Sequence, residues 1–159
     1  MNEEVFGHME FTFNEALLHY KNNKLEEWIQ KFLRAEDGDA PNPNFALADG
    51  LLLEDRKYFF PVQIPLDEIQ TVRIEKDILD ENELKHYHYK VDKIIEKLSN
   101  WDMPPLIVQY DENNLILTDG NHRFSALKRT GKVSYYAIVW CNADIAEQAR
   151  SMMISRGWL

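Results

Sequence analysis

The chain has 159 residues, and 18 Lys and Arg stand against 27 Asp and Glu, which gives a formal net charge of −9. This balance argues against a general DNA- or RNA-binding protein, because phosphate contacts supply most non-specific affinity and need cationic side chains. The single cysteine, Cys141, excludes a disulfide framework and suits a reducing compartment. Because no apolar run approaches the roughly 18 residues of a membrane span and the acidic start lacks a signal-peptide pattern, we predict a cytoplasmic protein with no membrane partner.

The first 40 residues predict two helices. Thr12 or Asn14 is expected to cap the first helix. The second carries apolar residues at helical spacing on one face, namely Leu25, Trp28, Ile29, Phe32 and Leu33. A loop over residues 36–44, rich in Pro and acidic residues, follows them. We therefore predict a helical N-terminal extension over residues 1–40 and a main domain over residues 41–159.

The middle of the chain predicts a sheet edge and a long helix. Leu51–Leu53 and Tyr58–Phe60 flank a charged turn and predict a hairpin. The segment from Val62 to Ile64 lies between two prolines, and proline lacks the N–H that a central strand needs, so this segment is expected at an edge. An apolar stripe indicates a helix from Asp80 to Leu98.

The last third alternates strands and helices. Leu106–Val108 and Leu115–Leu117 read as a hairpin. A helix is expected over His122–Thr130, then a strand over Tyr135–Trp140 and a helix over Ala143–Ser155. This order predicts an α/β protein (an α+β mixed sheet) with helices packed on it.

A sharp turn between a strand and a helix carries the chemistry that the sequence suggests. The first N–H groups of a helix have no intrahelical partner, so the helix that follows Gly120 offers donors to a phosphate or another oxyanion. Arg123 could bind phosphate oxygens bidentately, His122 could act as acid or base, and Asp119 could hold Mg²⁺ or take a proton. The structural alternative is a turn in which Asp119 caps the helix and Arg123 lies at the surface.

The segment from Pro105 to Val139 resembles the ParB/sulfiredoxin superfamily, often labelled the ParB-like nuclease domain. The shared pattern is a proline before an apolar strand, a second strand, a Gly-x-x-Arg motif at a helix start (Gly120 to Arg123), a helix that ends in glycine, and a final strand. Residues 62–69 look like the opening of that domain, so the resemblance covers about residues 60–141. It implies a ParB/sulfiredoxin-like fold.

The resemblance implies that the Gly-x-x-Arg loop binds nucleotide phosphates, through Gly120, Asn121, His122 and Arg123. Sulfiredoxin has a cysteine at the position of Asn121, so reduction of sulfinic acids is not expected. Few residues follow Val139, so the separate DNA-binding region of partition ParB proteins is not expected either.

The motif is most similar to the free-serine kinase branch, where it reads Asp-Gly-His-His-Arg. This likeness implies active-site roles for Asp119 and His122, with Mg²⁺ bridging Asp119 and the phosphates. It also implies a catalytic glutamate, for which Glu75 is the first candidate and Glu68 the competitor.

We therefore expect a protein that binds a nucleoside di- or triphosphate (ATP, ADP or CTP) with Mg²⁺. Two activities are open: phosphotransfer to a small hydroxyl substrate, or nucleotide hydrolysis. One alternative is a non-catalytic nucleotide-sensing or partner-binding module, in which the N-terminal helices dock a protein partner or a second copy. Another alternative is a ParB-like nuclease or DNA-binding protein, which the charge disfavours.

Overall fold

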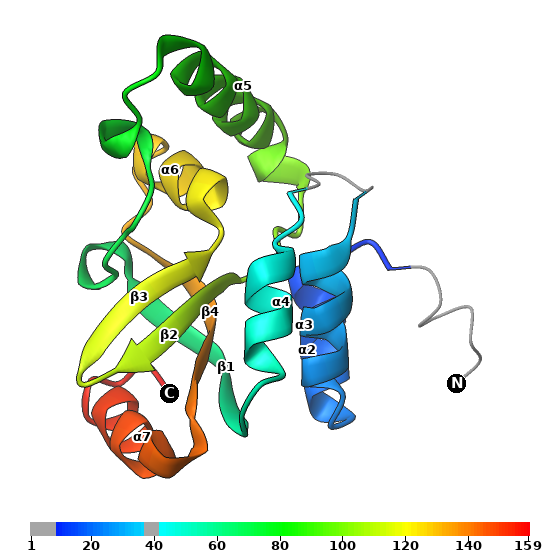
Figure 1. Cartoon of the computed structure of the whole chain (residues 1–159), viewed down its shortest axis with the longest axis vertical. Helices are drawn as coiled ribbons and strands as arrows, with labels where there is room; N and C mark the ends of the chain where they lie inside the picture. The colour runs from blue at the N-terminus through cyan, green and yellow to red at the C-terminus, as the bar shows by residue number, and fades with distance from the viewer. Residues whose placement is uncertain (1–8, 37–41) are drawn as a thin grey trace.

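The computed structural model describes residues 9–36 and 42–159. At its centre is a four-stranded sheet in the order β1-β4-β2-β3. The β1–β4 and β2–β3 pairs are antiparallel, whereas β2 and β4 are parallel. The predicted mixed α/β architecture is thus confirmed (Figure 1). The strands are β1 (Arg56–Pro65), β2 (Leu106–Asp111), β3 (Asn114–Asp119) and β4 (Ser134–Asn142).

Both faces of the sheet are buried. Side chains alternate between the faces of a strand, so Leu106 and Val108 of β2 contribute to one hydrophobic core while Ile107 contributes to the other. In β4, Val139 faces the first core and Ile138 faces the second. Continuous apolar runs are typical of strands that are covered on both sides.

The N-terminal helices cover one face of the sheet. They are α2 (Phe13–Lys21), α3 (Leu25–Arg34) and α4 (Phe45–Leu51), and Figure 1 shows them grouped together beside the strands. Thr12 caps α2 by accepting a hydrogen bond from the N–H of Glu15, as predicted. Trp28 and Ile29 of α3 are fully buried in the core that these helices share with the sheet.

The other core is covered by helices from the rest of the chain. These are α5 (Glu81–Lys97), α6 (Asn121–Arg129) and α7 (Ala146–Ser155), and all three contribute buried side chains to it. Short 3₁₀ helices connect the larger elements: η1 (Leu66–Glu68), η2 (Glu75–Asp77), η3 (Leu98–Asn100) and η4 (Ala143–Ile145).

The hairpin predicted between Leu51 and Phe60 is wrong. Leu51 ends helix α4, and Tyr58 and Phe59 pair with β4 rather than with residues 51–53. Asn44 caps α4 through its side chain, so a local helix start competes with the strand that the leucines suggested. The expected edge position of Val62 and Ile64 is confirmed, because β1 is the outer strand of the sheet.

The predicted boundary at residue 40 and the centre of the predicted loop, residues 37–41, lie outside the described residues. Within the described ranges, every helix is too short or too polar to traverse a lipid bilayer.

Candidate functional site

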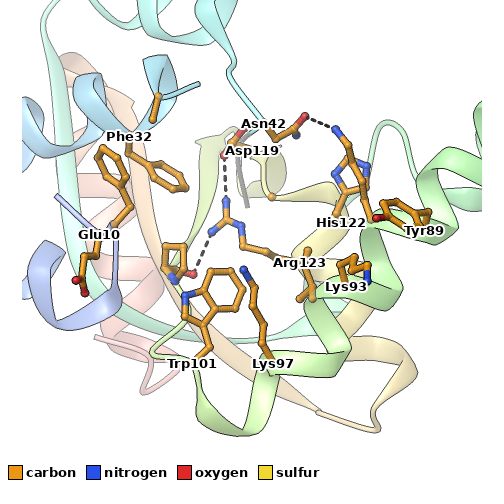
Figure 2. Close-up of a pocket in the computed structure, with 16 residues that line it drawn as sticks. Glu10, Phe32, Asn42, Tyr89, Lys93, Lys97, Trp101, Asp119, His122 and Arg123 are labelled. Carbon is orange, nitrogen blue, oxygen red and sulfur yellow. Dashed lines mark hydrogen bonds and ion pairs between the residues drawn. The ribbon is translucent and has the colours of Figure 1, made fainter. Parts of the chain in front are cut away.

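A pocket of about 280 Å³ lies where α5, the start of α6 and the N-terminal helices meet. This volume is close to the roughly 300 Å³ at the lower end of small-molecule sites. Figure 2 shows Arg123 in the middle of the lining side chains, with Phe32 and Glu10 on one side and His122 and Tyr89 on the other. Four of the predicted site residues line it, namely Asp119, Gly120, His122 and Arg123. The pocket therefore forms at the predicted motif.

Gly120 turns the chain from β3 into α6 with a left-handed φ of 109°. No side chain of the described residues caps this helix, so the N–H groups of its first turn keep their hydrogen-bonding capacity for a ligand. A Cβ on Gly120 would lie 2.9 Å from Leu106 Cδ2 and 3.0 Å from Arg123 Nη2. The structure shows that the space is taken by these two neighbours.

The Arg123 guanidinium is bound by the protein itself. Nη1 donates to the carbonyl oxygens of Pro104 and Pro105, and Nη2 donates to Asp119 Oδ2 at 3.0 Å. Arg123 is only 6% exposed, and burial lowers the pKa of its guanidinium, although the nearby carboxylate opposes this shift. Arg123 lines the pocket. It is buried, so the structural alternative that placed it at the surface does not hold. Its guanidinium N–H groups are bound by the protein, so they are not free to bind a phosphate bidentately as the sequence suggested.

Both carboxylate oxygens of Asp119 are engaged. Oδ2 accepts from Arg123, and Oδ1 accepts from the Asn44 side-chain amide at 3.2 Å. Asp119 is 8% exposed, and burial raises the pKa of its carboxyl group against the effect of Arg123. Among the described residues no group of three or more His, Cys, Asp and Glu side chains could hold a metal. Asp119 in this arrangement therefore does not fit a Mg²⁺ ligand.

His122 contributes a neutral imidazole to the pocket. Its ring packs on Tyr87 with centroids 4.4 Å apart. Burial, reinforced by the positive charges of Lys90 and Arg123, lowers the pKa of His122 to about 4. At neutral pH the ring therefore acts through hydrogen bonds or proton transfer rather than through a charge.

Three lysines of α5 converge on the same pocket. Lys90, Lys93 and Lys97 all line it, and their spacing of three and four residues places them on one face of the helix. Lys90 Nζ has a long hydrogen bond of 3.4 Å to Asn42, and Lys93 Nζ lies 3.5 Å from Glu96. Both contacts are weak, so the charges of Lys90 and Lys93 are available to an anionic ligand. Lys97 differs, because its Nζ lies 3.9 Å from the centre of the Trp101 ring.

Glu75 lies outside the pocket and joins a hydrogen-bonded chain behind it. Its Oε2 accepts from Ser125 Oγ at 2.9 Å and its Oε1 accepts from Arg129 at 3.4 Å. Ser125 Oγ lies 2.8 Å from the hydroxyl of Tyr87, which donates to the carbonyl oxygen of Asn121 at 2.9 Å. Glu75 thus supports the first turn of α6 through two hydroxyl groups, and it does not contact the pocket directly.

The competing acid, Glu68, pairs with Arg156 at 3.2 Å. It is not among the residues that line the pocket. Neither predicted candidate for the catalytic glutamate therefore faces the cavity, and their predicted role stays a prediction.

Phe32 lies at the end of the pocket opposite His122, and Trp101 lies beside Lys97 (Figure 2). Phe32 stacks on Trp28 with centroids 4.8 Å apart, and the Arg123 guanidinium carbon lies 5.1 Å from the centre of its ring. Phe11 packs against Phe32 at 5.6 Å, and Trp101 lines the pocket beneath them. The apolar stripe predicted Phe32 on the buried face of α3, and Phe32 packs against the core beneath that helix while it also lines the pocket.

No protein-family model and no curated protein sequence matches this chain. Solved structures similar to it include a sulfiredoxin from Arabidopsis thaliana, with 17% identity and a TM-score of 0.40 over 51% of this chain and 84% of that one. A free serine kinase in complex with AMP is 18% identical, with a TM-score of 0.37 over 50% of this chain and 30% of the kinase. A pNOB8-like ParB N-domain is 15% identical, with a TM-score of 0.40 over 62% of this chain and 33% of that one.

These structures represent the three groups of proteins to which the motif at Gly120–Arg123 is similar. The chain spans about a third of the kinase and ParB chains that it matches. The likeness concerns fold, so the chemistry of the site rests on the pocket itself.

Proposed function

We propose that the pocket binds the phosphates of a nucleoside di- or triphosphate. The observation that carries this proposal is the convergence of Lys90 and Lys93 of α5 with the uncapped start of α6, in a chain whose net charge is −9. Local positive potential against an acidic background favours an anionic ligand at this one place. Because Asp119 has no free oxygen, Mg²⁺ is assigned here to the bound nucleotide and to no residue of the chain.

Phosphotransfer to a small hydroxyl substrate is the finer proposal. The neutral ring of His122 lines the pocket and is the group that we assign to accept the hydroxyl proton. The hydroxyl oxygen would form a bond to the terminal phosphorus, the bond from that phosphorus to the bridging oxygen would break, and the nucleoside diphosphate would leave. The positive charges of Lys90 and Lys93 would stabilise the transferring group.

Binding is tested by isothermal titration of the chain with ATP, ADP and CTP in the presence of Mg²⁺. We expect at least one nucleotide to bind, and the double variant Lys90→Gln, Lys93→Gln to weaken that binding by about tenfold or more, since each charge-assisted contact contributes roughly 1 to 2 kcal/mol. Lys57→Gln is the matched control, because Lys57 lies on β1 away from the pocket. A folded sample that binds none of the three nucleotides overturns the proposal.

Turnover separates an enzyme from a sensor. Release of ADP or phosphate that is lost in His122→Gln, while nucleotide binding persists, supports phosphotransfer or hydrolysis. Tight binding without any release supports the non-catalytic, nucleotide-sensing alternative. Retention of DNA that weakens with salt would instead favour the ParB-like nuclease or DNA-binding alternative.

A further inference from the structure

Apolar side chains form much of the pocket wall. They come from three parts of the chain that meet here, namely the N-terminal helical segment, α5 and the stretch before β2 (Figure 2). The residues are Phe11, Phe32, Ala35, Ile94, Trp101 and Pro104. Such a lining favours a ligand with an apolar body, because carbon surface leaves water on both sides when the ligand binds.

The charged residues of the motif add little polarity to this wall, because the protein itself satisfies them. Arg123 donates to Asp119 and to the carbonyl oxygens of Pro104 and Pro105. The other carboxylate oxygen of Asp119 accepts from Asn44. A ligand group that bonded to either side chain would have to displace one of these contacts. Although the residues are charged, they form an occupied ion pair at the pocket.

Polar groups behind the aromatic side chains are also occupied or shielded. The carboxylate of Glu15 accepts from the N–H of Phe11 and from the indole N–H of Trp28. The indole nitrogen of Trp101 has no partner among residues 9–36 and 42–159, but it is buried from solvent and is therefore closed to a ligand in the cavity. A hydroxyl or ammonium group placed against this wall would lose its water without gaining a partner, which is unfavourable.

The rings of Phe32 and Trp101 are already engaged by the protein. Phe32 stacks on Trp28 with centroids 4.8 Å apart, and the Arg123 guanidinium carbon lies over the same ring at 5.1 Å. Lys97 Nζ lies over the Trp101 ring at 3.9 Å. A ligand therefore meets ring edges rather than free faces, which suits a flexible aliphatic chain better than a flat ring that needs a stacking partner.

The groups that can bind an anion lie on α5 and at the start of α6. Lys90 and Lys93 have only weak contacts, to Asn42 and Glu96, and the first turn of α6 adds backbone N–H groups. Glu10 also lines the pocket, but it is exposed and keeps its contact with water. The pocket thus combines a place for one anionic group with a wall that suits carbon.

We propose that the hydroxyl substrate of this site is an aliphatic alcohol without further polar groups, and that its phosphate monoester is the product. This inference rests on the proposed function, because it places the transferring phosphate at Lys90 and Lys93. The alcohol oxygen forms the bond to the terminal phosphorus, its proton passes to His122, and the nucleoside diphosphate leaves. The aliphatic chain lies against Phe32 and Ala35, where it needs no hydrogen-bond partner.

The test titrates the full chain with methyl, propyl and pentyl phosphate and with glycerol 3-phosphate. Affinity should rise by about twofold to fourfold for each CH₂ group added, until the chain fills the cavity of about 280 Å³. Glycerol 3-phosphate has the propyl skeleton with two added hydroxyl groups. It should bind more weakly than propyl phosphate by about tenfold or more, since these hydroxyl groups lose water without finding partners.

Two variants separate the apolar body from the anionic group. Ala35→Leu places extra carbon in the cavity from a half-buried position at the end of α3. It should weaken pentyl phosphate by about tenfold and change methyl phosphate by less than about twofold. Lys93→Gln should weaken all the monoesters by a similar factor. Ala143→Leu is the matched control, because Ala143 lies in η4 and not at the pocket, and it should leave every affinity unchanged.

The outcomes distinguish this inference from the proposed function. If a folded sample binds neither nucleotides nor monoesters, the proposed function fails and the inference fails with it. If nucleotides bind but the monoesters do not, or if their affinity is independent of chain length, only the aliphatic substrate is overturned. Equal affinity for glycerol 3-phosphate and propyl phosphate overturns it as well.

Discussion

Gly120 and Arg123 act together, because the guanidinium folds back over the position where a side chain on residue 120 would stand. The three residues that receive its hydrogen bonds, Pro104, Pro105 and Asp119, lie on both sides of the β2–β3 hairpin. The Gly-x-x-Arg spacing thus has a structural cause in this chain. Arg123 ties the start of α6 to the sheet, so the phosphate contacts that we propose are assigned to the helix start and to α5.

Three glycine-to-alanine variants test this cause. Gly120→Ala should lower the free energy of unfolding by about 2 to 4 kcal/mol, because it combines an unfavourable φ with contacts under 3.1 Å. Gly131→Ala, which has a left-handed φ of 79° but open space around it, should cost about 1 kcal/mol. Gly50→Ala, inside α4 with open space, should stabilise by about 0.5 kcal/mol.

Urea denaturation of the three variants measures these free energies. An effect of Gly120→Ala no larger than that of Gly131→Ala would show that backbone strain alone matters and that the close approach of Arg123 does not.

The sequence located the motif but not the roles of its residues. A Gly followed by His and Arg at a helix start predicts an anion site from local geometry alone, and that site lines a pocket. Whether Arg123 faces a ligand or the carbonyl groups of Pro104 and Pro105 depends on a contact across 18 or 19 positions, which no local pattern encodes. Lys90 and Lys93 were not predicted for the same reason, although their helical spacing was visible.

At the scale of elements, α5, η2 and α6 are joined by the hydroxyl groups of Tyr87 and Ser125. Tyr87 stays protonated, with its pKa raised by burial to about 12, so its hydroxyl keeps one proton to donate to the Asn121 carbonyl or to Ser125. Tyr87 and Ser125 have one hydroxyl proton each, and together they make three contacts: Ser125 with Glu75, Ser125 with Tyr87, and Tyr87 with Asn121. Because the protons are shared among these contacts, the two side chains are coupled.

A double-mutant cycle measures this coupling. Tyr87→Phe and Ser125→Ala should each lower the free energy of unfolding by about 1 to 2 kcal/mol, because each leaves buried groups without a partner. The double variant should cost less than the sum by about 0.5 to 1.5 kcal/mol, since both changes remove the same bond. Tyr89→Phe, on the exposed side of α5, should change stability by less than about 0.5 kcal/mol. Additive costs would mean that the two hydroxyl groups act independently.

Long periodic elements were predictable and short competing ones were not. The helix expected from Asp80 to Leu98 is α5, and the hairpin of Leu106–Leu117 is β2 and β3, because apolar periodicity fixes which face is buried. Helix α4 was missed because its seven residues include Gly50 and follow a proline-rich segment. Its start depends on the Asn44 side chain, which also reaches β3 at Thr118.

For the whole molecule, the sheet is the shared wall of two cores. The helices of residues 13–34, predicted as an extension, bury Ile107, Ile138 and Trp140 on the inner strands. A main domain of residues 41–159 would expose that apolar face to water. The arrangement therefore favours one cooperative folding unit, in which the predicted extension is part of the core.

Deletion of residues 1–35 tests this arrangement. The shortened chain should lose its near-ultraviolet circular dichroism and bind an apolar dye, because one face of the sheet is stripped of its cover. The full chain is the reference, and it should show a single unfolding transition. A shortened chain with a native spectrum and a cooperative transition would instead show that residues 36–159 fold independently.

At the start of α2, the N–H group of Phe13 donates to the carbonyl oxygen of Asp102 and the N–H group of Asn14 donates to its carboxylate. Hydrogen exchange at these two amides can therefore be used to follow ligand binding. The amide hydrogens of Phe13 and Asn14 exchange with solvent only when those bonds open, and Asp102 is adjacent to a residue that lines the cavity. A molecule bound against Trp101 should slow this opening. Deuterium uptake at Phe13 and Asn14 would then report occupancy of a cavity that is lined mostly by residues some ninety positions later in the chain.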